Sequence, residues 1–439
     1  MLSRNTSALV SVCLLGLLMS VPVSGEEPEE LSFPQLSDTG AVLAMTNAPS
    51  GNEVLMYRRA QDGTLTFLDR FATGGTGTSI LRELCNMPDS LGSQGSLTLS
   101  EDNRWLFAAN SSSHDISVFR VEENSLILVQ RIGSGGFFPV SITVRRNLLY
   151  VLNAGGEANL MGFTFRQGQL QPLDGSRRAL PEPPNSNPAH TCFSASQIAF
   201  TPQGFALVVT VKGGSPQDIP GDFGRIHVFP LDPDGLPSAV PTTTPSVGNL
   251  PFGFAFDELG RLYIAEIFAQ SPDTRRERPG IGVSAVSSYT MTPDGRLEVI
   301  STSVPNFQTT ACWALRLGPY LYTSNPFAGT LSGYVIAPDG TLSLLDADGV
   351  SGAVPDPDAA NPYTPFPADI ALAQSRTGRF LYSLNTGAST ISIFQIGDDG
   401  RLALLDNVRA SEHGLPILRC ERPNPPDCFD GGAQGLAAF

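Results

Sequence analysis

The segment LYSLN at residues 381–385, followed by ISIFQIGDDGRLALL at residues 391–405, decides the fold. It contains an apolar strand that ends in Asn385, a strand of alternating polarity, the dipeptide Asp399-Gly400 and a third apolar stretch. Asp-Gly between such strands is a strong hairpin signal, because both residues tolerate the positive φ of a type I′ turn. The segment therefore predicts three consecutive antiparallel strands.

This phrase recurs seven times, and self-similarity along a chain indicates a repeat architecture. A short apolar segment precedes all but the first copy, which gives a fourth strand. We therefore predict an all-β fold, a seven-bladed β-propeller with four antiparallel strands per blade. The apolar strands end at Asn47, Asn110, Asn153, Thr210, Glu266, Asn325 and Asn385, and the turns lie at residues 62–63, 123–124, 167–168, 234–235, 294–295, 339–340 and 399–400.

The first unit lacks its own preceding strand, whereas the chain ends in the strand-like sequence QGLAAF at residues 434–439. A propeller is closed when its last strand completes its first blade, which removes free sheet edges. We therefore predict that residues 434–439 form the inner strand of blade 1, pair with residues 41–47 and close the ring.

The N-terminal residues are typical of an export signal, with Arg4, an apolar run at residues 8–21 and the small pair Ser24-Gly25. The run is shorter than the ~18 residues that a membrane span requires, and no later segment is long enough. We predict a signal peptide at residues 1–25, an acidic N-terminal linker at 26–39 and the propeller at 40–439. The expected location is secreted or periplasmic, with no membrane insertion after signal cleavage.

The chain carries a net charge of −15, with a pI of about 4.7 and Lys212 as its one lysine. A field of this sign repels phosphate polymers and anionic lipids. We therefore expect no nucleic-acid or membrane-surface partner. We further expect a monomer that takes a small-molecule or carbohydrate ligand.

Five cysteines follow the predicted signal. Export makes disulfides plausible, and the short spacing of Cys420 and Cys428 favours a bond between them. Cys85 with Cys192 is a second candidate pair, and Cys312 is left over.

The loops indicate where a site would lie. We letter the four strands of a blade a to d, from the innermost outward. The d–a and b–c connections emerge on the same face, and here the d–a connections and two of the b–c loops are long, which favours a site at that mouth of the central channel. Glu266 and Asp369 are the candidate catalytic carboxylates. For the asparagines, local bonding at strand ends competes with a ligand role, and Trp313 either packs in its blade or stacks on a ligand. The candidate ligand-binding residues are Gln94, Gln197, Trp313, Asn325 and Gln434.

The sequence contains no Gly-x-Ser-x-Gly elbow, zinc-type motif or phosphate-cradling loop. His114, His190 and His413 fall in loops, and His227 falls in a strand. Asp356 and Asp358 fit either a solvated acidic loop or a calcium ligand pair. No cofactor is indicated, no metal ligands are assigned, and a divalent metal stays open.

The repeated LYxxN and DGxL phrases resemble the lactonase-type seven-bladed propellers, the superfamily of 6-phosphogluconolactonase and the carboxymuconate-lactonizing enzymes. The likeness spans the mature chain and includes the phrases at residues 251–256 and 332–334. For the catalytic members the resemblance implies a Gly-Pro-Arg-His start of strand a, with a Glu that closes the next strand. Here residues 194–197 read Ser-Ala-Ser-Gln and the Glu position is Val211, so those catalytic roles are not carried over.

Two function classes follow. The first is a hydrolase or isomerase that acts on a lactone or sugar-acid derivative at the channel mouth. The alternative is a non-catalytic exported binding propeller for a small molecule, glycan or protein. Because a phosphate requires basic partners, we predict no hydrolysis of 6-phosphogluconolactone at an enzyme-like rate.

Overall fold

The structure is a computed structural model that describes residues 39–78, 88–213, 223–269, 283–356, 363–417, 419–421, 427–429 and 432–439. The predicted signal peptide, all but the last residue of the predicted linker, Cys85 and Asp358 lie outside these ranges.

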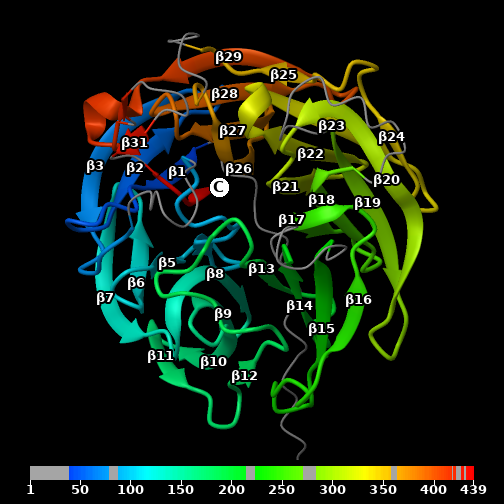
Figure 1. Ribbon diagram of the computed structural model, residues 1–439. Helices are drawn as coiled ribbons and strands as arrows, with labels where there is room; N and C mark the ends of the chain where they lie inside the picture. Colours follow the sequence, from blue (N-terminus) through cyan, green and yellow to red (C-terminus); the bar gives the residue numbers. More distant parts are fainter. Residues whose placement is uncertain are drawn as a thin grey trace, which may run out of the picture. The chain divides into compact units, whose positions relative to one another are not determined.

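Seven antiparallel sheets form a ring of blades (Figure 1), as the sequence predicts. In blades 2–7 the first strand in sequence is innermost, whereas blade 1 takes its inner strand from the C-terminus. Blade 1 contains β32 (Leu436–Ala438), β1 (Gly40–Met45), β2 (Glu53–Arg59) and β3 (Leu65–Ala72). Blade 2 contains β4 (Leu97–Leu99), β5 (Trp105–Asn110), β6 (Asp115–Glu122) and β7 (Ser125–Gly133). Blade 3 contains β8 (Phe137–Arg145), β9 (Leu148–Gly155), β10 (Asn159–Arg166) and β11 (Gln169–Pro172), with β12 (Arg178–Ala179) on β10.

The other blades follow the same order. Blade 4 contains β13 (Ala195–Phe200), β14 (Ala206–Val211), β15 (Arg225–Pro230) and β16 (Thr242–Pro245). Blade 5 contains β17 (Asn249–Phe256), β18 (Leu262–Phe268), β19 (Val283–Met291) and β20 (Leu297–Thr309). Blade 6 contains β21 (Ala314–Leu317), β22 (Tyr320–Asn325), β23 (Thr330–Ile336) and β24 (Leu342–Leu344), with β25 (Gly352–Ala353) on β23. Blade 7 contains β26 (Pro367–Gln374), β27 (Arg379–Asn385), β28 (Thr390–Ile396) and β29 (Leu402–Val408).

The inner strands contact one another in blade order, from β32 through β4, β8, β13, β17, β21 and β26 back to β32. The closing strand is confirmed. β32 pairs with β1 in antiparallel register, with Val42 opposite Ala438 and Ala44 opposite Leu436. The Arg59 Nε also donates to the main-chain oxygen of Phe439 at 2.9 Å.

The two repeated phrases bind each other across blade boundaries. The tyrosine of LYxxN in one blade donates its hydroxyl to the main-chain oxygen of the turn glycine in the next blade. The pairs are Tyr150 with Gly235 at 2.6 Å, Tyr322 with Gly400 at 2.7 Å and Tyr382 with Gly63 at 2.9 Å. The repeat thus encodes contacts between blades as well as the strands within them.

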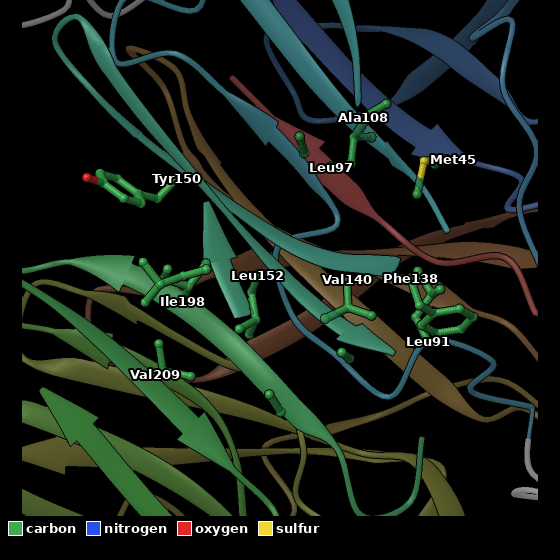
Figure 2. Close-up of a cluster of buried hydrophobic side chains, with 14 of the residues drawn as sticks. Met45, Leu91, Leu97, Ala108, Phe138, Val140, Tyr150, Leu152, Ile198 and Val209 are labelled. Atoms are coloured by element: carbon green, nitrogen blue, oxygen red, sulfur yellow. The ribbon is translucent and has the colours of Figure 1, made fainter. Parts of the chain in front are cut away.

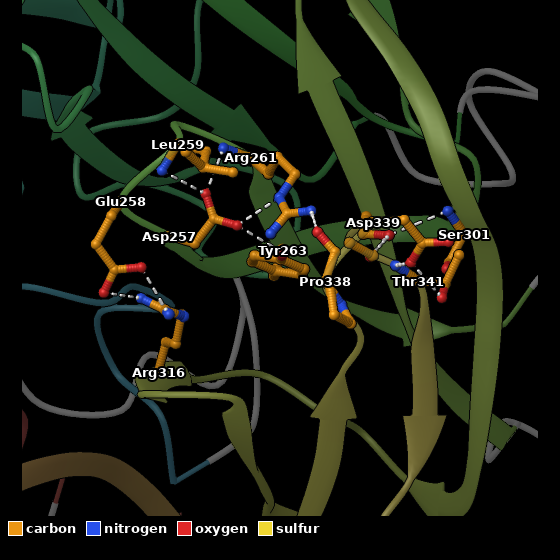
Figure 3. Close-up of polar contacts among 12 residues, drawn as sticks. Asp257, Glu258, Leu259, Arg261, Tyr263, Ser301, Arg316, Pro338, Asp339 and Thr341 are labelled. Atoms are coloured by element: carbon orange, nitrogen blue, oxygen red, sulfur yellow. Dashed lines mark hydrogen bonds and ion pairs between the residues drawn. The ribbon is translucent and has the colours of Figure 1, made fainter.

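Blades 5 and 6 use a variant of this contact (Figure 3). Tyr263 donates to the Asp257 carboxylate at 3.0 Å, and Asp257 also holds Arg261, whose guanidinium donates to the Pro338 carbonyl at 2.7 Å. An a–b turn is therefore fastened to the c–d turn of the next blade, on the face of the short turns. Burial by itself raises the pKa of Asp257, but its bonds to Arg261 and Tyr263 lower it overall.

Buried side chains fill the spaces between the blades (Figure 2). One cluster runs from Met45 in blade 1 through Leu97 in blade 2 and Leu152 in blade 3 to Val209 in blade 4. The same cluster includes Leu91, which belongs to the connection between β3 and β4. A loop residue is thus part of the core, which positions the site described below.

Some short elements were not predicted. They are β12, β25, the 3-10 helices Pro326–Ala328 and Ala410–His413, and the strand pair β30 (Arg419–Glu421) and β31 (Asp427–Phe429). Within the described ranges, no helix has the length and apolarity that crossing a bilayer requires.

Candidate functional site

Residues 88–94, which we call the crossing segment, run across the central channel. Ser90 accepts a hydrogen bond from Asn47 in blade 1 at 2.8 Å. The carbonyl of Ser93 accepts one from the Trp313 indole in blade 6 at 3.0 Å. Because the segment leaves blade 1 for blade 2 and is also bonded to blade 6, it occupies the channel rather than its rim.

Gln94, the last residue of the crossing segment, bonds to two other blades. Its amide makes two bonds with the main chain of Ala314 in blade 6, each 2.9 Å long, while its own N–H donates to Ser196 in blade 4 at 3.0 Å. A Cβ on Gly253 would lie 2.0 Å from the Gln94 oxygen, so glycine leaves room for the amide. The side chain that we predicted to bind a ligand therefore braces the channel.

Asp89 and Lys212 are two buried residues of opposite charge that both bond to Gly92 in the crossing segment. The Asp89 carboxylate accepts the N–H of Gly92 at 2.5 Å, and the Lys212 ammonium donates to the Gly92 carbonyl and lies 4.8 Å from the centroid of the Phe252 ring. Asp89 is 8% exposed and Lys212 is 1% exposed. The two charges attract each other, and the free thiol of Cys312 is buried close enough to interact with both.

Burial disfavours the charged form of each group. It raises the pKa of Asp89 to about 6, with the charge of Lys212 acting in the opposite direction. It lowers the pKa of Lys212 to about 8, against the attraction of Asp89. Both pKa values thus move toward neutrality, where proton transfer is most useful.

Asp369 adds a second buried carboxyl. It lies in β26, is 3% exposed, and accepts the N–H of Ile370 at 3.1 Å together with the N–H groups of Gly435 and Leu436. Burial raises the pKa of Asp369 to about 8, and the charge of Asp89 adds to the rise. Asp369, which the sequence predicted as a site residue, thus interacts electrostatically with Asp89 in the crossing segment. Its hydrogen bonds join blade 7 to β32. We call Asp89, Lys212, Cys312 and Asp369 the channel cluster.

Glu266 lies elsewhere. Its side chain is fully buried in blade 5, where the carboxylate accepts the N–H of Gly248 at 2.8 Å and the Ser303 hydroxyl at 2.7 Å, as well as a bond from Ser287. Burial raises its pKa. These contacts explain how the carboxylate can be buried without a ligand, and we do not carry Glu266 into the proposed chemistry.

The remaining candidates differ in their partners. Gln197 accepts the N–H of Phe254 at 2.6 Å and donates to its carbonyl at 3.2 Å, which joins blades 4 and 5. Asn325 donates to Thr330 and Ser332 inside blade 6. Beyond its bond to Ser93, the buried Trp313 packs 4.9 Å from Phe252, measured between ring centroids.

Gln434 is different. Its side chain is fully buried, yet neither its amide nitrogen nor its amide oxygen has a hydrogen-bond partner among the residues that the structure describes. The structure thus brings Asp369, Gln94, Trp313 and Gln434 to the channel, whereas Glu266 and Asn325 lie within blades.

The sequence did not single out Asp89 or the catalytic potential of Lys212. Their pairing depends on the path of a loop, which no strand periodicity reports. The one usable signal was a lone lysine directly after an apolar strand end.

Comparisons with known proteins bear on the fold. No protein-family model and no curated protein matches the chain. Among solved structures, a putative 6-phosphogluconolactonase from Bacteroides fragilis has a TM-score of 0.59 at 17% identity, covering 87% of this chain and 97% of that one. The periplasmic gluconolactonase of Pseudomonas aeruginosa has a TM-score of 0.58 at 16% identity, covering 91% and 99%.

The chain has the fold of the lactonase-type seven-bladed propellers. In this chain Ala195 pairs with Val211 across β13 and β14. An apolar side chain therefore occupies the strand-end position where the resemblance implies a Glu, directly before Lys212.

Other predicted features are located only in part. In the portion of the chain that the structure describes, no group of three or more His, Cys, Asp or Glu residues is arranged to hold a metal ion. Cys192 is disulfide-bonded. The backbone register of β30 and β31 places Cys420 opposite Cys428, and their side chains lie outside the described set.

Proposed function

We propose that this lactonase-type propeller hydrolyses a lactone in the channel, with Asp89 as general base. The observation that carries the proposal is the buried Asp89–Lys212 pair, whose pKa values of about 6 and about 8 bracket neutrality. Perturbed pKa values of opposite groups in one water-poor site are typical of acid–base catalysis.

The chemistry follows from these charges. Asp89 takes a proton from water as the water oxygen attacks the lactone carbonyl carbon. The carbonyl electron pair moves onto its oxygen, and the Lys212 ammonium stabilises that negative charge. When the tetrahedral intermediate collapses, the ring C–O bond breaks and the leaving oxygen takes a proton, which yields the open hydroxy acid.

Asp369 is the proposed donor of that proton. A carboxyl with a pKa of about 8 holds its proton at neutral pH and can therefore act as an acid, while Asp89 is mostly ionised. Two carboxyls with separated pKa values divide the acid and base roles in this way in other hydrolases. The Asp89 proton then passes to Asp369, which returns both carboxyl groups to their starting states.

The substrate class follows from charge and from the neighbouring structures. One of those structures is described as a putative 6-phosphogluconolactonase and another as a periplasmic gluconolactonase. The channel cluster offers a single cation, Lys212. Since Asp89 already partners it, a phosphate would lack the basic groups it requires. An unphosphorylated sugar lactone fits better. We further propose that the protein is exported and acts as a monomer, in keeping with its N-terminal sequence and its charge.

Direct kinetics test this proposal. Purified mature protein is mixed with glucono-1,5-lactone or its 6-phosphate, and acid release is followed against the uncatalysed rate. We expect turnover of the sugar lactone and little of the phosphate ester. Binding without turnover of any lactone would instead favour the exported binding propeller.

A further inference from the structure

Gln434 carries an unmet hydrogen-bonding capacity in the middle of a well-bonded region. Its side chain is fully buried, and within the described ranges both amide atoms are without hydrogen-bond partners. A buried amide without hydrogen bonds destabilises a fold, so such groups in native structures call for a ligand or water to explain them.

The main chain on both sides of Gln434 is held in place. The Ala433 carbonyl accepts the Thr386 hydroxyl of blade 7 at 2.9 Å, and the N–H of Gly435 goes to the Asp369 carboxyl. These bonds fix the backbone that carries the amide, so the amide is presented by a rigid element.

Gly432, two residues before Gln434, bonds this part of the chain to the crossing segment. The Gly432 carbonyl accepts a bond from Asn47 at 3.1 Å and another from Ser90 at 3.1 Å, and Ser90 adjoins Asp89. Gln434 therefore lies in the chain between Gly432, which bonds to the residue next to Asp89, and Gly435, whose N–H goes to the Asp369 carboxyl.

We propose that Gln434 is a specificity-determining residue that binds the hydroxyl groups of a polyhydroxylated lactone ring. This inference rests on the proposed function, since it assigns the substrate class of that site. An amide offers two donors and one acceptor, which matches a sugar hydroxyl that both donates and accepts. A lactone ring without hydroxyl groups could only accept from the amide and could not pair with its oxygen.

The same reasoning predicts a distinctive variant. Gln434→Met keeps the length of the side chain and removes the polar atoms. A side chain needed for structure would lower the melting temperature when replaced. An amide that waits for a ligand would leave the melting temperature unchanged or raised, because a buried unpaired group has been removed.

The test measures binding, so it does not depend on catalysis. Gluconolactam, a sugar ring that lacks the hydrolysable ester, is titrated calorimetrically into wild type, Gln434→Met and the control Gln395→Met, whose side chain is exposed. We expect the Gln434 variant to bind at least about tenfold more weakly, with an equal or higher melting temperature. We expect the control to match wild type, and δ-valerolactam, which has no hydroxyls, to show no difference among the three.

Three results would overturn the inference: no lactam binding by wild type, equal affinities for wild type and Gln434→Met, or an affinity loss accompanied by a lower melting temperature. Failure of the proposed hydrolysis is a separate result. A protein that opens no lactone but binds the lactam through Gln434 would refute the catalytic role and leave the binding role intact.

Discussion

The Tyr382 hydroxyl of blade 7 donates to the main-chain oxygen of Gly63 in blade 1, at 2.9 Å, across the seam where the ring closes. Tyr382 is fully buried, and burial raises the pKa of its phenol well above the usual range. The tyrosine of the LYxxN phrase thus meets the glycine of the DGxL phrase, and the closure of the propeller depends on both.

This contact predicts the effect of Tyr382→Phe. The change removes one buried hydrogen bond and leaves the Gly63 carbonyl unpaired, which should lower the free energy of unfolding by about 1–2 kcal/mol. Chemical denaturation measures this loss. Tyr320→Phe is the matched control, because Tyr320 bonds to Asp398 at the solvent-exposed side and should lose less. Equal losses for both variants would contradict the role of the seam.

A second prediction concerns the brace across the channel. Gln94→Leu removes both side-chain bonds to Ala314. The buried N–H and carbonyl of Ala314 then lose these partners. We expect a loss of about 2–3 kcal/mol in the free energy of unfolding. Gln203→Leu serves as the control, since the bond from Gln203 to Glu258 is exposed to solvent. A Gln94 variant as stable as the control would mean that the crossing segment is not held by this amide.

The strands and their pairing were predictable because they are encoded locally. The Asp-Gly turns and the alternating apolar residues act within a few positions, and the missing first strand pointed to the C-terminus. The site was less predictable. Glu266 and Asp369 have the same sequence signal, a carboxyl near a strand end, yet one is bonded inside blade 5 and the other meets the channel. What separates them is the loop at residues 88–94, whose path depends on contacts with several blades.

Asp369 predicts a pH dependence of stability. The folded protein holds this proton up to about pH 8, whereas an unfolded Asp releases it near pH ~3.9. Between these values the folded state binds more protons, so stability falls as the pH rises, by up to about 1.4 kcal/mol per pH unit for one proton. Asp369→Asn should lack this component. We expect the variant to gain stability relative to wild type from pH 4 to pH 8, and parallel stability curves would argue against a raised pKa.

The hairpin of β30 and β31 predicts a disulfide. Residues directly opposite in an antiparallel pair have Cα separations of ~4.5–5.5 Å, within the range of disulfides, and Cys420 faces Cys428 in this register. Peptide mapping without reduction should find the two linked. The bond should add about 2–3 kcal/mol to stability. Alkylation of both as free thiols would rule the pairing out.

The central claim is that Asp89 is the general base of a lactone hydrolysis. The decisive measurement is the pH profile of kcat/KM for glucono-1,5-lactone with wild type, Asp89→Asn and the control Asp234→Asn, whose carboxylate is exposed on a turn. The account predicts a bell-shaped wild-type profile that rises through about pH 6 and falls above about pH 8. It also predicts at least about a hundredfold loss in Asp89→Asn and an unchanged control. A wild type no faster than the uncatalysed reaction, or an Asp89 variant as active as wild type, would contradict it.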